Sequence, residues 1–150
     1  MPPKEIRNRQ AFYQFEILEK VEAGIALIGS EVKSIRDGNV SFTDSYVRIE
    51  GGEAFLVSCH IAEYKNAQTF GHEPRRRRKL LLRKREIAKL TKRVEQKGFT
   101  LVPLRIFFNN RGYAKLDVGI GRGKKRHDKR QSERERDSHR DLRREMAKYR

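Results

Sequence analysis

Apolar and polar residues alternate over much of the chain up to residue 120, in short runs separated by glycine-containing breaks. From residue 11 to residue 28, apolar side chains such as Phe15 and Ile17 alternate with polar ones before Gly24 interrupts the pattern. A period of two is typical of a half-buried strand. A glycine inside a strand often marks a bulge or a close backbone approach. We therefore expect either two strands joined near Gly24 or one strand bent there.

Two further strand pairs are predicted as hairpins by the turn-forming residues between their strands. Gly51 and Gly52 separate the strands of the first pair, and the run 109–112, which ends in glycine, separates those of the second. Adjacent glycines favour the tight turns with positive φ that connect antiparallel strands. The predicted strands cover residues 45–50, 53–59, 99–108 and 113–120.

Two helices are predicted among these strands. The first covers residues 30–37, with Ser30 as its N-cap and Gly38 in the left-handed position after its last turn. The second covers residues 84–97, where apolar residues recur at helical spacing until Gly98 ends the pattern. Its apolar stripe consists of Ile87, Ala88, Leu90 and Val94.

Short strands, local hairpins and two helices together indicate a mainly β fold with flanking helices, arranged as a small antiparallel barrel or sandwich. The polar residues 1–10 are expected to form a flexible N-terminal segment, and residues 62–74 a loop. Residues 11–120 are long enough for one domain with its own core. Residues 121–150 form a separate tail.

The tail has too few apolar residues to fold alone. It carries thirteen Lys or Arg and six Asp or Glu, which gives it a net charge of +7. Four acidic residues recur every four positions from Glu133 to Glu145, and each has a cation three residues later. Pairs at this spacing are neighbours on a helix surface. We expect a tail that is disordered when free and helical on a polyanion; the alternative is a solvated solubility tail.

The net charge of the whole chain is +16, so the part before the tail is basic as well. Excess cations on both parts favour a nucleic-acid partner. The tail lacks the apolar face of a membrane-binding helix, because it has no Trp or Phe and one Leu. Neither a long apolar stretch nor an apolar signal segment is present, which predicts a cytoplasmic protein with no membrane partner. The single cysteine, Cys59, lies in an apolar run and is expected to be buried.

The densest charge in the chain is a run of five cations directly before the three leucines 80–82. We place the run at a loop-to-helix junction, where burial of the leucines would fix the cations as donors to RNA phosphates. Replacing the arginines is then expected to weaken RNA binding and leave stability nearly unchanged. A solvated basic loop is the alternative. The five cations are Arg75, Arg76, Arg77, Arg78 and Lys79.

Patterns for catalysis or metal binding are weak. The four histidines have no ligand spacing, and a single cysteine excludes a zinc ribbon. The spacing of a P-loop is absent, and nothing resembles a nucleophile elbow. We expect no metal, no cofactor and no enzymatic activity, since a hydrolase would need distant residues to converge.

Seven short segments form an ordered and specific set from Asn8 into the tail. They are NRQA at 8–11, EAGI at 22–25, EVKS at 31–34, DSYV at 44–47, RKLLL at 78–82, GFTLVPL at 98–104 and GKKRHDKR at 123–130. Together they resemble the SmpB family, the SsrA-binding proteins of bacteria. The resemblance implies an oligonucleotide-binding-type barrel that binds the tRNA-like domain of transfer-messenger RNA. It also implies a tail that occupies the decoding site and the empty mRNA channel of a stalled ribosome during trans-translation.

The resemblance further implies which residues contact RNA. A carboxylate at Glu22 repels phosphate, so it would accept hydrogen bonds from base amino groups or hold a neighbouring arginine. Leu81 would position the arginine run, and His127 would stack on a ribosomal base. The residues matched to RNA binding are Asn8, Arg9, Glu22, Gly24, Leu81 and Lys115. Those matched to the decoding site are Lys124, Lys125, His127, Asp128, Lys129 and Arg130.

Gly121 stands where the family often has Ala. This difference bears on how rigidly the tail is attached to the barrel. Two other functions compete with the adaptor hypothesis: a general RNA-binding or ribosome-associated barrel protein, and a nuclease or RNA-modifying enzyme. An adaptor should prefer a folded tRNA-like RNA, whereas a general RNA-binding protein should not. Loss of RNA in the presence of a divalent metal would indicate the enzyme. The chain is expected to be a monomer.

Overall fold

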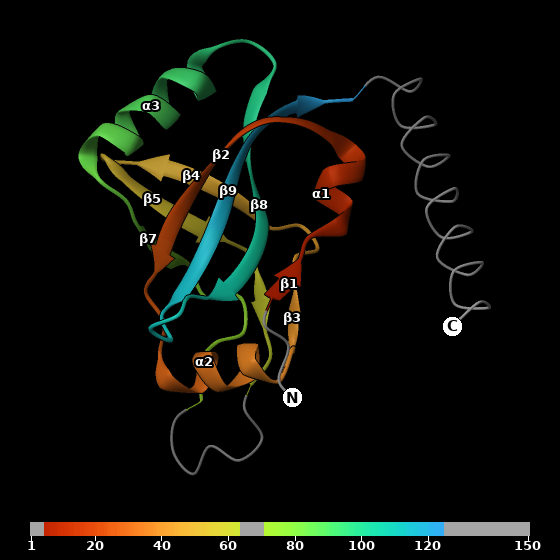
Figure 1. The fold of residues 1–150 in the computed structure, drawn as a ribbon, viewed down its shortest axis with the longest axis vertical. Coiled ribbons are helices and arrows are strands. Elements are labelled where there is room, and N and C mark those ends of the chain that lie inside the picture. The colour runs from red at the N-terminus through yellow and green to blue at the C-terminus, as the bar shows by residue number, and fades with distance from the viewer. Residues whose placement is uncertain (1–4, 64–70, 125–150) are drawn as a thin grey trace, which may run out of the picture.

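A seven-stranded antiparallel sheet forms the body of the protein, with the strand order β1-β8-β9-β2-β7-β5-β4 (Figure 1). The computed structural model describes residues 5–63 and 71–124. The strands are β1 (Glu5–Arg7), β2 (Phe15–Ile25), β3 (Val40–Ser41), β4 (Tyr46–Glu50), β5 (Glu53–Val57), β6 (His60–Ile61), β7 (Arg78–Leu81), β8 (Phe99–Phe108) and β9 (Ala114–Gly123). The helices are α1 (Arg9–Gln14), α2 (Gly29–Arg36) and α3 (Lys84–Glu95). Strands β3 and β6 pair separately.

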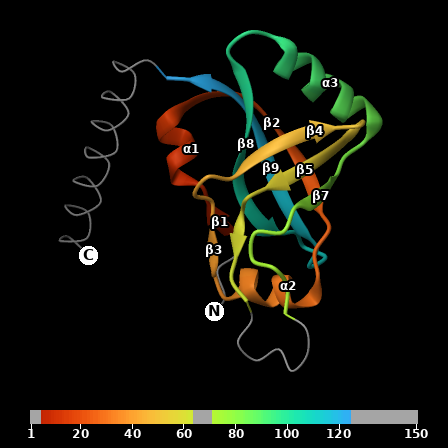
Figure 2. The same cartoon turned by 180° about the vertical axis from the view of Figure 1, so that it is seen from behind.

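The sheet is strongly curved, because β4 at one edge also lies against β8 near the other edge. Helix α3 packs against β8, whereas α2 lies by β6 at the opposite end of the molecule (Figures 1 and 2). This arrangement confirms the predicted fold class, mainly antiparallel β with flanking helices. Among the described residues, no helix is long and apolar enough to cross a membrane.

Both predicted hairpins are present. Gly51 and Gly52 connect β4 to β5 with φ angles of 59° and 76°, which a residue with a side chain rarely adopts. The second hairpin joins β8 to β9, and β9 continues to Gly123, opposite Phe15 of β2. Strand β9 therefore extends three residues beyond the predicted end of this strand at residue 120. Gly121 is part of this strand: a Cβ added there would lie 2.9 Å from the carbonyl oxygen of Glu16.

The N-terminal region differs from the sequence-based prediction. Glu5–Arg7 pairs with β8, and residues 9–14 form a helix where we expected first a flexible segment and then a strand. The buried side chain of Asn8 explains the difference, because its Nδ2 donates to the carbonyl oxygen of Pro103 at 2.8 Å and its Oδ1 accepts from the Ala11 N–H at 3.4 Å. This second bond caps the helix. Strand β2 then runs unbroken past Gly24, with an irregularity between Ile17 and Glu19.

The two predicted helices exist, with different ends. Helix α2 begins at Gly29, and its N-cap is Ile28 rather than Ser30, because the Glu31 carboxylate accepts from the Ile28 N–H at 2.8 Å. Gly38 has a φ of 80° after the helix, as expected. Helix α3 ends at Glu95, two residues before the predicted end. Of its apolar stripe, only Leu90 is buried, while Ala88 and Val94 are exposed.

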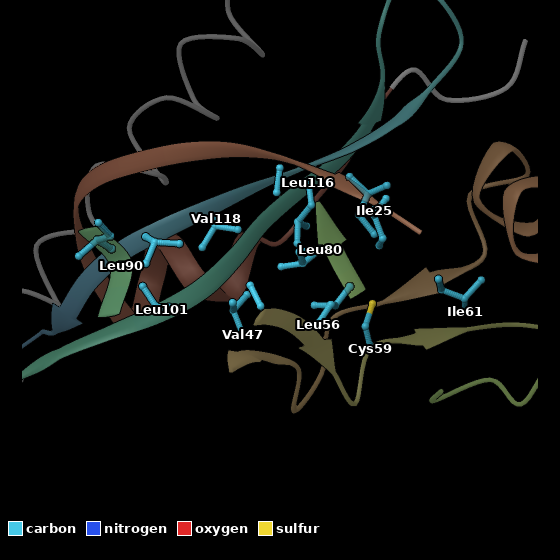
Figure 3. Packing of buried hydrophobic residues seen from close by; sticks show 14 of the residues in the cluster. Ile25, Val47, Leu56, Cys59, Ile61, Leu80, Leu90, Leu101, Leu116 and Val118 are labelled. Atoms are coloured by element: carbon cyan, nitrogen blue, oxygen red, sulfur yellow. The ribbon is translucent and has the colours of Figure 1, made fainter. Parts of the chain in front are cut away.

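The main core fills the space enclosed by the curved sheet. Figure 3 shows Ile25, Leu56, Leu80 and Leu116 converging there from β2, β5, β7 and β9. Cys59 belongs to the same core and is buried, as predicted, and its burial raises the pKa of the thiol to about 11. A smaller cluster of Ala11, Val102 and Leu104 packs between α1 and the outer face of the sheet.

Candidate nucleic-acid interface

The arginine run lies partly in a strand, and the strand divides it between two faces. Successive side chains of a strand point to opposite sides. Along β7, Arg78 and Leu80 are buried, whereas Lys79 and Leu81 are exposed. The run is therefore not at a loop-to-helix junction, and the leucines do not form one buried anchor, since 56% of Leu81 is exposed.

Arg78, which the sequence predicts as an RNA contact, lies in the interior of the protein. None of its side chain is exposed, and its Nε donates to the Glu31 carboxylate at 2.6 Å. Its two remaining nitrogens donate to the carbonyl oxygens of Cys59 at 2.7 Å and Pro74 at 3.0 Å. Arg76 donates to the other oxygen of Glu31 at 2.6 Å. Glu31 thus joins α2 to the segment that enters β7.

The charge state of Glu31 follows from this network. Burial alone would raise the pKa of its carboxyl group. Hydrogen bonds from Arg76 and from the Ile28 backbone, together with the charge of Arg78, outweigh burial, so the pKa is lowered. Glu31 is accordingly an ionised, fully buried carboxylate that needs its cations.

The outward-pointing residues of the run remain available to a ligand. Lys79 forms an ion pair with Glu53 at 3.4 Å, and both side chains are about half exposed. Arg77 donates to Glu50 at 3.0 Å under similar exposure. Arg75 is exposed and donates to the carbonyl oxygen of Ser58 at 3.0 Å. Of the five predicted phosphate donors, the exposed ones are therefore Arg75, Arg77 and Lys79.

Four of the predicted RNA-binding residues meet on the outer face of the sheet. Gly24 of β2 lies opposite Leu81 of β7 on one side and Lys115 of β9 on the other, and Glu22 is two positions earlier on β2. All four line one depression together with Lys79. Strand pairing brings these positions together although they are far apart in the sequence.

Gly24 sets the shape of this depression. A Cβ added at Gly24 would lie 3.1 Å from the Leu81 Cβ, closer than ordinary packing allows. The glycine therefore lets Leu81 lie across β2 with its side chain largely open to solvent. The result is a small apolar surface in the depression that Lys115 also lines.

Glu22 is the carboxylate whose role the sequence leaves open. Its side chain is exposed, and within residues 5–63 and 71–124 no arginine or lysine forms an ion pair with it. In this structure Glu22 therefore does not hold a neighbouring arginine. Of the two roles considered for Glu22, its exposed carboxylate is compatible with accepting hydrogen bonds from base amino groups.

The N-terminal pair of predicted RNA-binding residues lies elsewhere. Arg9 is exposed on α1, but Asn8 is buried and uses its amide to cap α1 and to bind β8. The structure therefore gives Asn8 a structural role, and its contact with RNA stays a prediction. Neither residue lines the depression that contains Glu22 and Leu81.

The root of the tail is held against α1. The Lys124 N–H donates to the Gln14 carbonyl oxygen at 3.0 Å, and its Nζ donates to the Phe12 carbonyl oxygen at 3.0 Å. A lysine near the last carbonyl groups of a helix is a favourable arrangement. The other predicted decoding-site residues lie outside the described part of the chain: Lys125, His127, Asp128, Lys129 and Arg130.

The aromatic partners of the exposed cations were not predicted from the sequence. The Arg77 guanidinium carbon lies 3.6 Å from the centre of the Phe55 ring, and that of Arg105 lies 4.0 Å from the Phe107 ring. Their strand positions were predictable, but the pairing of β5 with β7 was not. The residues that the structure describes contain no group of three or more His, Cys, Asp or Glu placed to hold a metal ion.

The chain is similar to several known proteins. The family model described as SmpB protein matches residues 5–148. The SsrA-binding protein of Mesorhizobium japonicum is 54% identical over 121 residues, which cover 81% of this chain and 76% of that protein. The SsrA-binding protein of Thermus thermophilus is 54% identical over 123 residues, which cover 82% and 85%.

A solved structure is also similar to the fold. It is described as "tmRNA-SmpB: a journey to the center of the bacterial ribosome", and its chain is 53% identical with a TM-score of 0.71. The match covers 83% of this chain and 87% of that one. The resemblance inferred from the seven sequence segments is therefore confirmed.

Proposed function

This chain belongs to the SmpB family, and from that membership we propose that it is an RNA-binding adaptor of trans-translation. It binds the tRNA-like domain of transfer-messenger RNA and delivers that RNA to stalled ribosomes. Its C-terminal tail then fills the decoding site and the empty mRNA channel. The observation that carries the proposal is the depression on the outer face of the sheet, which Glu22, Gly24, Leu81 and Lys115 line together.

The depression offers three kinds of contact to a folded RNA. Lys79 and Lys115 supply cations for phosphates, which provide affinity without sequence preference. Leu81 beside Gly24 supplies an apolar surface for a sugar or base face. Glu22 supplies an acceptor for the amino group of a guanine or cytosine. Only an RNA with a fixed fold presents phosphates and a base amino group at matching distances, which favours a structured partner.

The same proposal covers how and where the chain works. It acts by binding and catalyses no reaction itself. It functions as a single protomer in the cytoplasm, the location of its two proposed partners. The contacts of Lys124 with α1 support the division of labour, because they fix the start of the tail on the barrel that holds the RNA.

Binding to transfer-messenger RNA, with a tRNA control, and tagging on stalled ribosomes test the proposal. Affinity for transfer-messenger RNA should fall linearly on a log–log salt plot, with a slope of about −0.7 to −0.9 per neutralised phosphate. Lys115→Gln should weaken binding and reduce this slope by about one phosphate contact. Lys92→Gln on the exposed face of α3 is the matched control, because it removes the same charge away from the depression.

Three outcomes would contradict the proposal. Equal affinity for transfer-messenger RNA and for unstructured RNA of the same length would indicate a general RNA-binding protein. An affinity independent of salt would exclude the phosphate contacts. RNA cleavage that depends on the chain and a divalent metal would indicate an enzyme.

A further inference from the structure

We propose that Arg77 forms a stacking site for one unpaired nucleobase of the bound RNA, on the outer face of β4, β5 and β7. The base lies against the guanidinium plane of Arg77, and Phe55 supports that plane from below. This inference rests on the proposed function and adds to it a contact to a single-stranded part of the RNA. In this proposal Arg77 contacts a base, whereas the sequence predicts that it donates hydrogen bonds to phosphates.

The first observation is the contact between Arg77 and Phe55. At 3.6 Å from the ring centre, the guanidinium carbon of Arg77 is in van der Waals contact with the ring. The guanidinium carbons of Arg7 and Arg36 lie farther from the centres of the Phe12 and Phe108 rings, at 5.3 and 5.4 Å. The Phe55 ring therefore covers one side of the Arg77 guanidinium, and 46% of the Arg77 side chain remains exposed.

The second observation is the position of Glu50. Its carboxylate accepts a hydrogen bond from Nη1 of Arg77 at 3.0 Å. This bond occupies an edge of the guanidinium and places a negative charge where a phosphate would otherwise bind. Hydrogen bonds of a guanidinium lie in its plane, so the bond to Glu50 leaves the side away from Phe55 open. A planar, weakly hydrated surface of this kind suits the face of a nucleobase.

Cations for the neighbouring phosphates flank this surface. Phe55 lies opposite Arg48 of β4 and opposite Lys79 of β7, and side chains at paired positions lie on the same face of a sheet. Both cations are about half exposed or more, and their partners are the surface carboxylates Glu50 and Glu53. The surface pair of Lys79 with Glu53 is weak, so a phosphate can replace that carboxylate, whereas Glu50 is also bound by Arg77. Arg105, the other cation close to a ring, is less suitable because Asp117 and Glu5 both bind it.

The stacking site adjoins the depression that binds the folded RNA. Lys79 lines that depression, and it is two residues before Leu81 and two after Arg77 on the same outward-facing side. An RNA held at Leu81 and Lys115 therefore places its next unpaired nucleotide within reach of Arg77. A peptide partner is less consistent with this surface, since a peptide chain lacks phosphates for the cations on both sides.

A double-mutant cycle between protein and RNA tests the proposal. The RNA is the tRNA-like domain of transfer-messenger RNA, with each unpaired nucleotide replaced in turn by an abasic one that keeps its phosphate. The protein is the full chain, either unchanged or with Arg77→Lys, which keeps the charge and loses the planar surface. At one position, loss of the base should weaken binding to the unchanged chain about tenfold and should not weaken binding to Arg77→Lys further.

Two further variants keep the result interpretable. Arg85→Lys on α3, exposed and outside the proposed site, should respond to every abasic position as the unchanged chain does. Phe55→Leu removes the support below Arg77 and should abolish sensitivity at the same position, with a melting curve to show that the protein is folded.

The outcomes separate this inference from the proposed function. If the unchanged chain and Arg77→Lys lose the same factor at every abasic position, the stacking site is wrong and the RNA-binding function stands. The same holds if Arg77→Lys weakens binding while no abasic position matters, because Arg77 then contacts a phosphate. If the unchanged chain does not bind the tRNA-like domain at all, both proposals fail.

Discussion

Replacing Arg78 with Met should lower the free energy of unfolding by about 4 kcal/mol, because the groups that lose their hydrogen bonds stay buried. Methionine fills similar space but has no donors, so the Cys59 and Pro74 carbonyl oxygens and one oxygen of Glu31 lose their partner. Each buried polar group left unpaired costs about 1–3 kcal/mol. Arg76 still donates to Glu31, which keeps the cost of the carboxylate moderate.

Urea unfolding followed by circular dichroism measures this loss, with Arg77→Met as the matched control. Arg77 is the neighbour on the other face, and its exposed ion pair with Glu50 contributes about 0–1 kcal/mol. In thermal unfolding, Arg78→Met should lower the midpoint by about 10–20 °C, and Arg77→Met by only a few degrees. Equal stability of the two variants would refute the assignment of alternate arginines to the interior and the surface.

This prediction revises an expectation from the sequence. The sequence alone predicts that the arginines 75–78, as an exposed cluster, can be replaced with stability nearly unchanged. With Arg76 and Arg78 bound to buried Glu31, replacement of all four arginines should instead unfold much of the protein. A loss of RNA binding in that variant would then say nothing about phosphate contacts.

Four further predictions follow from particular residues. The pKa of Glu31 is lowered in the folded protein, so its ion pairs stabilise the fold fully at pH values above the unfolded pKa of 4.5. This stabilisation is lost as the pH falls through the folded pKa. In urea titrations, acid should therefore destabilise the wild type more than Glu31→Gln. Cys59, with a pKa of about 11, should react slowly with iodoacetamide at about pH 8 in the native protein and rapidly in urea; equal rates would contradict its burial. Gly24→Ala should displace Leu81 and weaken binding to transfer-messenger RNA severalfold, whereas Gly29→Ala, where a Cβ meets nothing within 4 Å, should not. Truncation after Lys124 should preserve RNA binding and abolish tagging, and normal tagging by the truncated chain would reduce the tail to a solubility device.

Local signals predicted much of the fold. The Gly51–Gly52 turn identified the first hairpin, because two residues with positive φ almost require glycine. Gly38 marked the end of α2 for the same reason, whereas Gly98, also at positive φ, lies three residues beyond the last residue of α3. Helix α1 could not be predicted, since its cap at Asn8 depends on bonds to β8, almost one hundred residues away in the sequence. A tertiary contact overrides the strand-like alternation there.

The binding surface was predictable in part. Basic composition indicated an RNA partner, and the family resemblance identified Glu22, Leu81 and Lys115. The division of the arginine run was hidden, because four identical residues carry no alternation to detect. Its signal lay in Glu31, a carboxylate in the first turn of a helix, whose cationic partners are 45 and 47 residues away. Phe55 gave no signal because strand pairing alone brings it below Arg77.

The buried ion pair between Glu31 and Arg78 also fixes the register of β7. Three consecutive leucines fit the core equally well if the strand slips by one residue, so apolar burial alone does not choose between the two alignments. A slip that turns Leu81 inward, away from Gly24, would move Arg78 to the solvent and bring Lys79 into its place beside Glu31. Lysine lacks the planar set of donors with which Arg78 binds Glu31, Cys59 and Pro74. The buried ion pair therefore selects one of the two possible registers of β7. It keeps Lys79 and Leu81 in the depression that we propose as the RNA-binding surface, although Glu31 and Arg78 are both buried on the other side of the sheet.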